Sequence, residues 1–225
     1  MTEKTFDEAV RLLESRVNLE QLQSFEPDKM TGRLDMIRQI LADLGNPEQQ
    51  YRTIHVAGTK GKGSVCAFLE LIFLTEGKRV GTFTSPHLYF FTERIKIDGN
   101  PCSDDDFTRL MFSVCDKIEP AKLAELTYFE LLTLLAFVYF SEQKIDAAII
   151  EVGLGGRLDA TNVCNPDVTV ITSISYDHMM QLGPSLAEIA AEKSGEFSRV
   201  KRKYKLRNGD FSKTEQKVQD GRKIT

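Results

Sequence analysis

The sequence predicts an α/β protein with a mostly parallel sheet flanked by helices. Short runs of β-branched and apolar residues alternate with longer segments of helical spacing, which is typical of right-handed βαβ units. The continuous apolar run Ala147–Ile150 indicates a strand that is buried on both faces, as in a parallel sheet. The glycine-rich segment Gly58–Ser64 stands between a predicted strand and a predicted helix, which is the context of a phosphate-binding loop.

The composition is that of an ordinary globular protein. The 225 residues are 41% hydrophobic and 28% charged with a net charge of −4, which argues against a nucleic-acid partner. The longest apolar run, Leu131–Phe140, is about half of the ~20 residues that a membrane span needs. The acidic N-terminus has no apolar core of a secretory signal. Four widely spaced cysteines indicate reduced thiols in the cytoplasm, and neither disulfides nor a zinc site.

Two helices are expected before the first strand. Thr5 and Glu8 fit a capping box that opens the first helix. Apolar residues recur at helical spacing from Leu34 to Leu44, and Gly45 ends this second helix. A loop is expected between the two helices, over residues 24–32.

Strands and helices then alternate. The strands are predicted at residues 53–57, 79–84, 147–150 and 168–173, with a helix over 65–75. Ser103 is the expected N-cap of the next helix, and Thr127 and Ser185 open two more with capping boxes. Ligands of such sheets bind beyond the carboxyl ends of the strands. Four segments that follow strands should therefore converge on one crevice: Gly58–Ser64, Ser85–His87, Glu151–Asn162 and Asp177–His178.

The phosphate loop carries the strongest functional signal. Its glycines let successive N–H groups turn toward phosphate oxygens, and the helix that follows adds positive potential. Lys62 can reach the terminal phosphates, and the hydroxyl of Ser64 suits Mg²⁺. The spacing departs from GxxxxGKS, because Val56 stands where the first glycine would be and Gly63 separates the lysine from the serine. The alternative is a turn that only closes a βα unit. The expected nucleotide-binding residues are Gly58, Thr59, Lys60, Gly61, Lys62, Gly63 and Ser64.

The loop and four further stretches resemble the folylpolyglutamate synthases and dihydrofolate synthases, which are members of the Mur ligase superfamily. The other stretches are Thr84–His87, Glu93–Gly99, Glu151–Asn162 and Asp177–Gly195. The resemblance covers residues 34–195. It implies a P-loop ATPase-like domain of the Mur ligase type, of which this chain holds the N-terminal ATP-binding part.

The resemblance implies ATP and Mg²⁺ as cofactors, with Ser85, Glu151 and His178 as metal ligands. Glu151 ends an apolar strand at the ligand edge of the sheet, and carboxylates are ligands that Mg²⁺ prefers. A helix cap or a salt bridge is the alternative for Glu151. Ser85 could equally be a turn residue before Pro86. Nitrogen is an unusual magnesium ligand, so the assignment of His178 follows from the resemblance alone.

Further roles also follow from the resemblance. Lys62, His178 and Lys193 are expected to be catalytic, and Lys193 is carbamylated in the family so that it can ligate a second Mg²⁺. On the sequence alone, Lys193 is a surface cation near the end of a helix.

The resemblance also implies three residues that contact substrate, namely Arg94, Asp159 and Asn162. On the sequence alone, Arg94 is a surface residue paired with Glu93. His55 lies within a buried strand and is expected to be structural.

The implied reaction is ATP-dependent ligation of L-glutamate to a folate or a dihydropteroate through an acyl phosphate. The expected enzyme is a cytoplasmic monomer with no nucleic-acid or membrane partner. Two alternatives stay open at this point: another Mur-type amino-acid ligase, and a nucleotide-binding fragment without turnover.

The charge distribution divides the chain near residue 195. Residues 196–225 hold ten lysines and arginines against four acidic residues, a net charge of +6, which leaves −10 for residues 1–195. We expect one ATP-binding domain over residues 1–195, incomplete at its C-terminal side, and an irregular basic tail over 196–225. Because the charge changes where the resemblance ends, a truncated or frame-shifted product is expected. A genuine basic tail for an anionic partner is the alternative.

Overall fold

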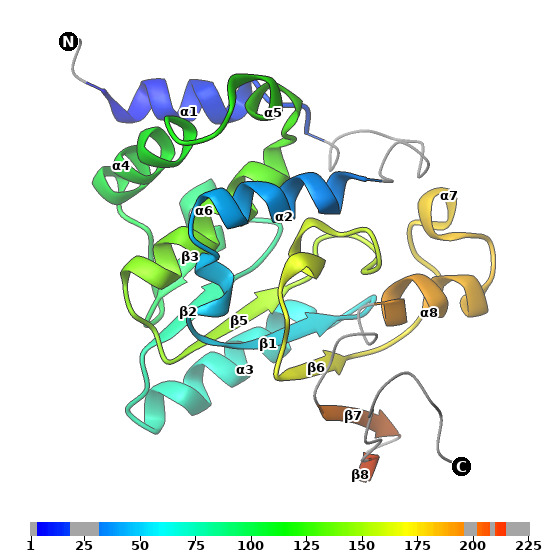
Figure 1. The fold of residues 1–225 in the computed structure, drawn as a ribbon. Coiled ribbons are helices and arrows are strands. Elements are labelled where there is room, and N and C mark those ends of the chain that lie inside the picture. Colours follow the sequence, from blue (N-terminus) through cyan, green and yellow to red (C-terminus); the bar gives the residue numbers. More distant parts are fainter. Residues whose placement is uncertain (1–3, 19–31, 196–201, 208–209, 215–225) are drawn as a thin grey trace.

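The computed structural model describes residues 4–18, 32–195, 202–207 and 210–214, and their strands form one sheet. The strand order is β4-β3-β2-β5-β1-β6-β7-β8 (Figure 1). Four parallel strands make up the centre: β1 (Arg52–Ala57), β2 (Val80–Phe83), β5 (Ala147–Glu151) and β6 (Val168–Ile171). These are the four predicted strands. The predicted α/β class with a mostly parallel sheet is confirmed.

Antiparallel pairs complete the sheet beside β2. There β3 (Ile95–Ile97) pairs with β2, and β4 (Asn100–Pro101) pairs with β3. These two short strands were not predicted from the sequence.

Two strands lie within the segment that was expected to be irregular. β7 (Arg202–Arg207) pairs with β6 in parallel, and β8 (Asp210–Thr214) pairs with β7 in antiparallel. The prediction of an irregular tail is therefore wrong for these residues. Tyr204 and Leu206 alternate with basic residues, which is a strand pattern. β7 pairs with the backbone groups of β6 that β1 leaves unpaired.

Helices surround the sheet. The α-helices of the described residues are α1 (Phe6–Glu14), α2 (Arg33–Asp43), α3 (Lys62–Thr75), α4 (Asp104–Cys115), α5 (Pro120–Glu125), α6 (Tyr128–Glu142), α7 (Met179–Leu182) and α8 (Leu186–Ser194). Short 3-10 turns are η3 (Pro47–Gln49), η4 (Phe91–Arg94) and η5 (Ala160–Val163). No helix in the described parts of the chain is long and apolar enough to cross a membrane.

The predicted helix starts are confirmed with one exception. Thr5, Thr127 and Ser185 form capping boxes, and the Ser103 side chain accepts a hydrogen bond from the Asp106 N–H. Helix α3, however, begins earlier than predicted, because the phosphate loop turns directly into it at Gly61. Residues 24–31 of the predicted loop lie outside the described residues.

The two faces of the sheet are covered unequally. Helices α2 and α6 lie over one face and α3 over the other (Figure 1). Helix α6 is buried on nearly all sides, as a helix of mostly apolar residues should be. Under α3 a smaller cluster packs, formed by Val56, Cys66, Val80 and Ile149. Because β1 leads through the Gly58–Ser64 loop into α3 and the central strands are parallel, their carboxyl ends and the start of α3 lie at the same edge of the sheet.

Candidate functional site

The Gly58–Ser64 loop joins β1 to α3, and it is hydrogen-bonded to the segment that follows β6. The Thr59 N–H donates to the Ser173 carbonyl at 2.7 Å, and the Thr59 hydroxyl donates to the Ser175 carbonyl at 3.2 Å. The Thr172 hydroxyl donates to the Lys60 carbonyl at 2.8 Å. The loop is thus held at the carboxyl ends of two neighbouring parallel strands, where ligands of such sheets bind.

Two glycines allow the backbone conformation of the loop. Gly58 has φ of 138°, and Gly61 has φ of 83° at the N-cap of α3. Such positive φ values favour glycine. The first N–H groups of a helix have no partner within the helix, and they are suited to phosphate oxygens.

A Gly58→Ala substitution should disrupt this loop. A Cβ added at Gly58 would lie 2.0 Å from Thr172 Oγ1, and its φ is already unfavourable for other residues. We expect a loss of about 3 kcal/mol in the free energy of unfolding, from strain and overpacking together. Urea denaturation measures it. Gly77→Ala is the matched control, because Gly77 has φ of 69° but open space around it. Equal losses in the two variants would contradict the close approach of Thr172.

Glu151 is the centre of the site. It ends β5 and is buried, with a fractional exposure of 4%. Lys62 Nζ lies 3.9 Å from Glu151 Oε1, and the Ser85 N–H donates to Oε2 at 3.2 Å. Burial raises the pKa of the Glu151 carboxyl, and the Lys62 charge opposes that increase. The structure thus brings Lys62, Ser85 and Glu151 together.

The Glu151 carboxylate fits a magnesium ion, and Ser64 and Ser85 line the same cavity. A Cβ added at Gly63 would lie 3.7 Å from Glu151 Oε2, so the glycine leaves space beside the carboxylate. Carboxylate and hydroxyl oxygens are the hard ligands that Mg²⁺ prefers. The carboxylate also borders a cavity of about 490 Å³, lined by Gly61, Gly63, Ser64, Ala67, Thr84, Ser85, Pro86, His87, Leu88, Glu93, Lys96, Pro101 and Glu151.

His178 does not join this group in the described part of the chain. It is exposed, has φ of 47°, and its Nε2 lies 3.7 Å from Asp177 Oδ2. The described residues contain no set of three His, Cys, Asp or Glu side chains that could hold a metal. Of the three predicted ligands, Ser85 and Glu151 lie together, and the role of all three as metal ligands stays a prediction.

Lys193 is buried, so its interpretation as a surface cation is wrong. Its fractional exposure is 3%, and its Nζ donates to the Gly58 carbonyl at 3.1 Å. Helix α8 is held to the loop after β5 by an ion pair between Arg157 and Glu192 at 2.9 Å. These contacts place the Lys193 ammonium against the first residue of the phosphate loop.

Arg94 is also buried rather than exposed. Its Nε donates to His87 Nδ1 at 2.9 Å, and its guanidinium lies 5.5 Å from the centre of the Tyr128 ring. The Glu93 carboxylate instead accepts N–H groups of its own loop, at Leu88, Tyr89 and Phe90. Glu93 and the His87 that Arg94 contacts line the cavity, and substrate contact by Arg94 stays a prediction.

Asp159 and Asn162 hold the loop that follows β5. The Asp159 carboxylate accepts the N–H groups of Leu154 and Thr161, each at 2.9 Å. The Asn162 amide donates to the Arg157 carbonyl at 2.9 Å. Burial raises the pKa of Asp159, and these hydrogen bonds oppose the increase. Substrate contact by either residue stays a prediction.

His55 is buried within β1, as expected, and should make the protein less stable in acid. Its Nε2 lies 2.8 Å from Thr161 Oγ1, and burial lowers the pKa of His55 to about 3. An unfolded chain binds this proton below about pH 6.5. Stability should therefore fall as the pH drops from about 6.5 toward 3, by about 1.4 kcal/mol per pH unit. Urea denaturation between about pH 7 and 5 should show a shallower slope for His55→Gln than for the wild type. Equal slopes would contradict the shift.

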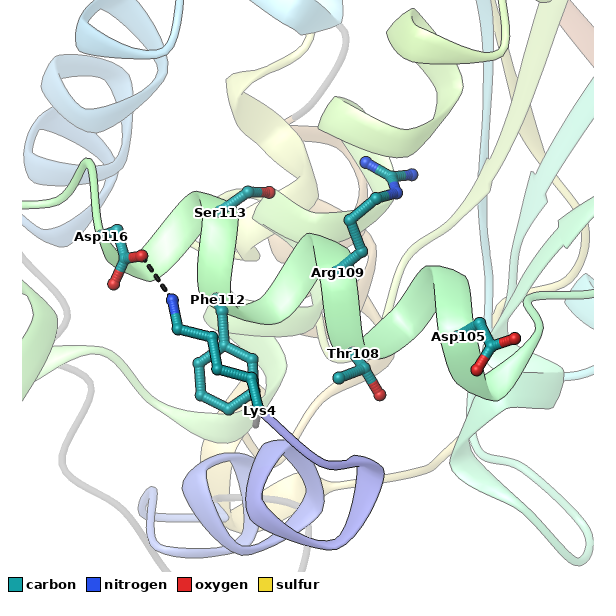
Figure 2. A pocket seen from close by; sticks show the side chains of 7 residues that line it. All are labelled: Lys4, Asp105, Thr108, Arg109, Phe112, Ser113 and Asp116. Carbon is teal, nitrogen blue, oxygen red and sulfur yellow. Dashed lines mark hydrogen bonds and ion pairs between the residues drawn. The ribbon is translucent and has the colours of Figure 1, made fainter. Parts of the chain in front are cut away.

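A second surface hollow has a different character. Figure 2 shows it along α4, with Lys4 and Asp116 forming an ion pair at 2.7 Å. Its lining residues are Lys4, Asp105, Thr108, Arg109, Phe112, Ser113 and Asp116. None of the loops that follow the central strands lines it, so the cavity at Glu151 is the candidate site.

The polar segment after β6 was missed as part of the site. Thr172, Ser173 and Ser175 hold the phosphate loop through its backbone and through Thr59. The sequence does carry a signal, because hydroxyl residues directly follow an apolar strand at its carboxyl end.

Comparison with known proteins assigns the family. The Mur ligase middle domain matches residues 56–224. The chain belongs to the Mur ligase family.

Two similar proteins indicate which members of the Mur ligase family the chain resembles. A dihydrofolate synthase/folylpolyglutamate synthase of Bacillus subtilis is 48% identical over 166 residues, 72% of this chain and 39% of that protein. A folylpolyglutamate synthase of Arabidopsis thaliana is 47% identical over 161 residues, 70% of this chain and 28% of that protein.

Solved structures of the same kind have the same fold. A folylpolyglutamate synthase of Mycobacterium tuberculosis complexed with ADP superposes with a TM-score of 0.76 at 36% identity, over 87% of this chain and 42% of that one. An FPGS-AMPPCP-folate complex superposes with a TM-score of 0.76 at 37% identity, over 85% and 46%. The chain thus spans less than half the length of each of these relatives.

Proposed function

We propose that this chain is the ATP-binding part of a ligase that adds L-glutamate to a folate or a dihydropteroate through an acyl phosphate. One observation carries the proposal: Lys62 and the Ser85 N–H both contact the buried Glu151 carboxylate, beside a phosphate loop at the ends of parallel strands. The names of the relatives and the folate and AMPPCP complex support the choice of substrates.

The residues of the chain would first bind the nucleotide. The loop N–H groups and the Lys62 ammonium would hold the β- and γ-phosphate oxygens of ATP. Glu151 and Ser85 would hold Mg²⁺, which supplies charge neutralisation to the phosphates when bound. Positioning and charge neutralisation account for most of the catalysis of phosphoryl transfer.

The substrates then supply the reacting groups. A substrate carboxylate attacks the γ-phosphorus, which gives an acyl phosphate and releases ADP. The amine of L-glutamate attacks the acyl carbon, loses a proton and displaces inorganic phosphate. The acyl phosphate must be shielded from water during this time. Lys193 and His178 are proposed to act at the same site, Lys193 as a carbamate, and Arg94, Asp159 and Asn162 are proposed substrate contacts. We place the enzyme in the cytoplasm as a monomer.

Phosphate release tests the proposal. With ATP and Mg²⁺, the chain should release inorganic phosphate only when L-glutamate is present together with dihydropteroate or tetrahydrofolate. Release that requires a peptidoglycan precursor instead would indicate another Mur-type ligase. Only release that requires such a precursor would contradict the proposal, whereas nucleotide binding without release under any of these conditions would indicate an ATP-binding part without turnover of its own.

A further inference from the structure

A single acidic residue interrupts the apolar sequence of α3 after its first turn. This residue, Glu70, has a fractional exposure of 8%, and its Oε1 accepts a hydrogen bond from the Thr82 hydroxyl at 2.6 Å. Burial of a carboxylate is unfavourable unless it is paired and hydrogen-bonded. Packing of α3 does not require a charge here, because the neighbouring inward positions are apolar.

The partner of Glu70 is Lys96 on β3. Lys96 Nζ lies 3.3 Å from Glu70 Oε2. Lys96 is directly opposite Thr82 in the β2–β3 register, so both side chains stand on the face of the sheet that α3 covers. The Lys96 side chain is 23% exposed and lines the cavity that Glu151 borders. Glu70 and Thr82 therefore fix the ammonium of Lys96 at the cavity wall.

This ion pair lies close to the nucleotide site. The Cys66 thiol is buried at the start of α3, and its pKa is raised chiefly by burial. The charges of Glu151 and Lys62 act on this thiol, and so do those of Lys96 and Glu70. Both ion pairs therefore lie within electrostatic range of the first turns of α3.

A positive charge in the lining of the cavity would favour the binding of an anion. Its described lining includes the carboxylates of Glu93 and Glu151, and Lys96 is the one lysine or arginine among those residues. An anionic substrate that enters beside a nucleotide would be repelled by these carboxylates and by the phosphates. Lys62 and the loop N–H groups are proposed to bind the nucleotide phosphates, so Lys96 is the lysine of the lining that can bind the other anion.

We propose that Lys96 binds a carboxylate of the acyl-donor substrate, and that Glu70 is a positioning residue that holds Lys96 in place. The inference rests on the proposed function, because it takes a folate-type acid as the second ligand. It adds a specificity-determining residue: the chain should distinguish the acid from a neutral analogue of the same shape.

Equilibrium binding tests this role. Folate and its diamide, in which both carboxylates are neutral amides, are titrated into the chain in the presence of Mg²⁺ and AMPPCP. The wild type should prefer folate about tenfold, and Lys96→Gln should abolish that preference, because a charged hydrogen bond is lost. Lys96→Arg should retain it. Lys78→Gln is the matched control, because Lys78 is exposed in the turn before β2.

Two further variants separate a binding role from a structural one. Glu70→Gln should weaken folate binding several-fold without altering AMPPCP affinity. The double variant Lys96→Gln/Glu70→Gln leaves no unpaired buried charge, and it should bind folate no better than Lys96→Gln.

Three results would overturn the inference: a wild type that does not bind folate, a folate preference that survives in Lys96→Gln, or an AMPPCP affinity that falls in parallel with folate affinity. Failure of the proposed function itself would be seen separately, as phosphate release by the wild type that requires a peptidoglycan precursor.

Discussion

Replacing Lys62 with alanine should lower the affinity for Mg²⁺-AMPPCP about 100-fold, because charge-assisted hydrogen bonds to phosphate are lost. The Lys62 ammonium lies 3.9 Å from Glu151 Oε1 at the start of α3, where it can contact both a phosphate and the carboxylate that is proposed to hold Mg²⁺. Isothermal titration calorimetry measures the affinity directly.

The control for this variant is Lys78→Ala, which removes an exposed lysine outside the site. It should change the affinity less than twofold, within the range of weak surface effects. If Lys62→Ala and Lys78→Ala bind the nucleotide equally well, the Gly58–Ser64 loop is a turn and not a phosphate site.

Replacing Glu130 with alanine should cost about 4 kcal/mol of the free energy of unfolding, because it leaves a half-buried guanidinium without its carboxylate. Glu130 is buried at the start of α6, and its carboxylate accepts hydrogen bonds from Nε and Nη2 of Arg33. The same carboxylate accepts a hydrogen bond from the Thr127 N–H at 2.8 Å, which completes the capping box. Urea denaturation measures the loss.

Glu142→Ala is the control within the same helix. Glu142 pairs with Arg109 at 2.8 Å, but both side chains are more than a third exposed. An exposed pair contributes roughly 0.5 kcal/mol, so this variant should remain close to the wild type. A loss in Glu130→Ala that is no larger than in Glu142→Ala would show that the Arg33–Glu130 pair is not a buried link between α2 and α6.

The elements that the sequence predicted well are those that depend on local signals. The capping boxes at Thr5, Thr127 and Ser185 need only residues within one helical turn. The central strands are continuous apolar or β-branched runs, which differ clearly from their polar flanks. β3 and β4 were missed because they are short, and β7 and β8 because basic residues obscure their alternation.

The site was predictable where strands position it directly. Lys62, Ser85 and Glu151 follow or end β1, β2 and β5, which are neighbours in the sheet, so their proximity follows from topology. His178 follows the end of β6 by several residues, and no strand fixes its place. The burial of Lys193 was not predictable, because it depends on a contact with Gly58, which is 135 residues away in the chain.

The central claim is that the phosphate loop, Ser85 and Glu151 together bind a nucleotide and its Mg²⁺. The dependence of nucleotide affinity on magnesium tests this claim most directly. AMPPCP affinity is measured with Mg²⁺ and with a chelator, for the wild type and for Glu151→Gln. We predict that Mg²⁺ strengthens binding about tenfold or more in the wild type and hardly at all in the variant, since the amide lacks the carboxylate charge. An equal strengthening in both proteins would contradict the site.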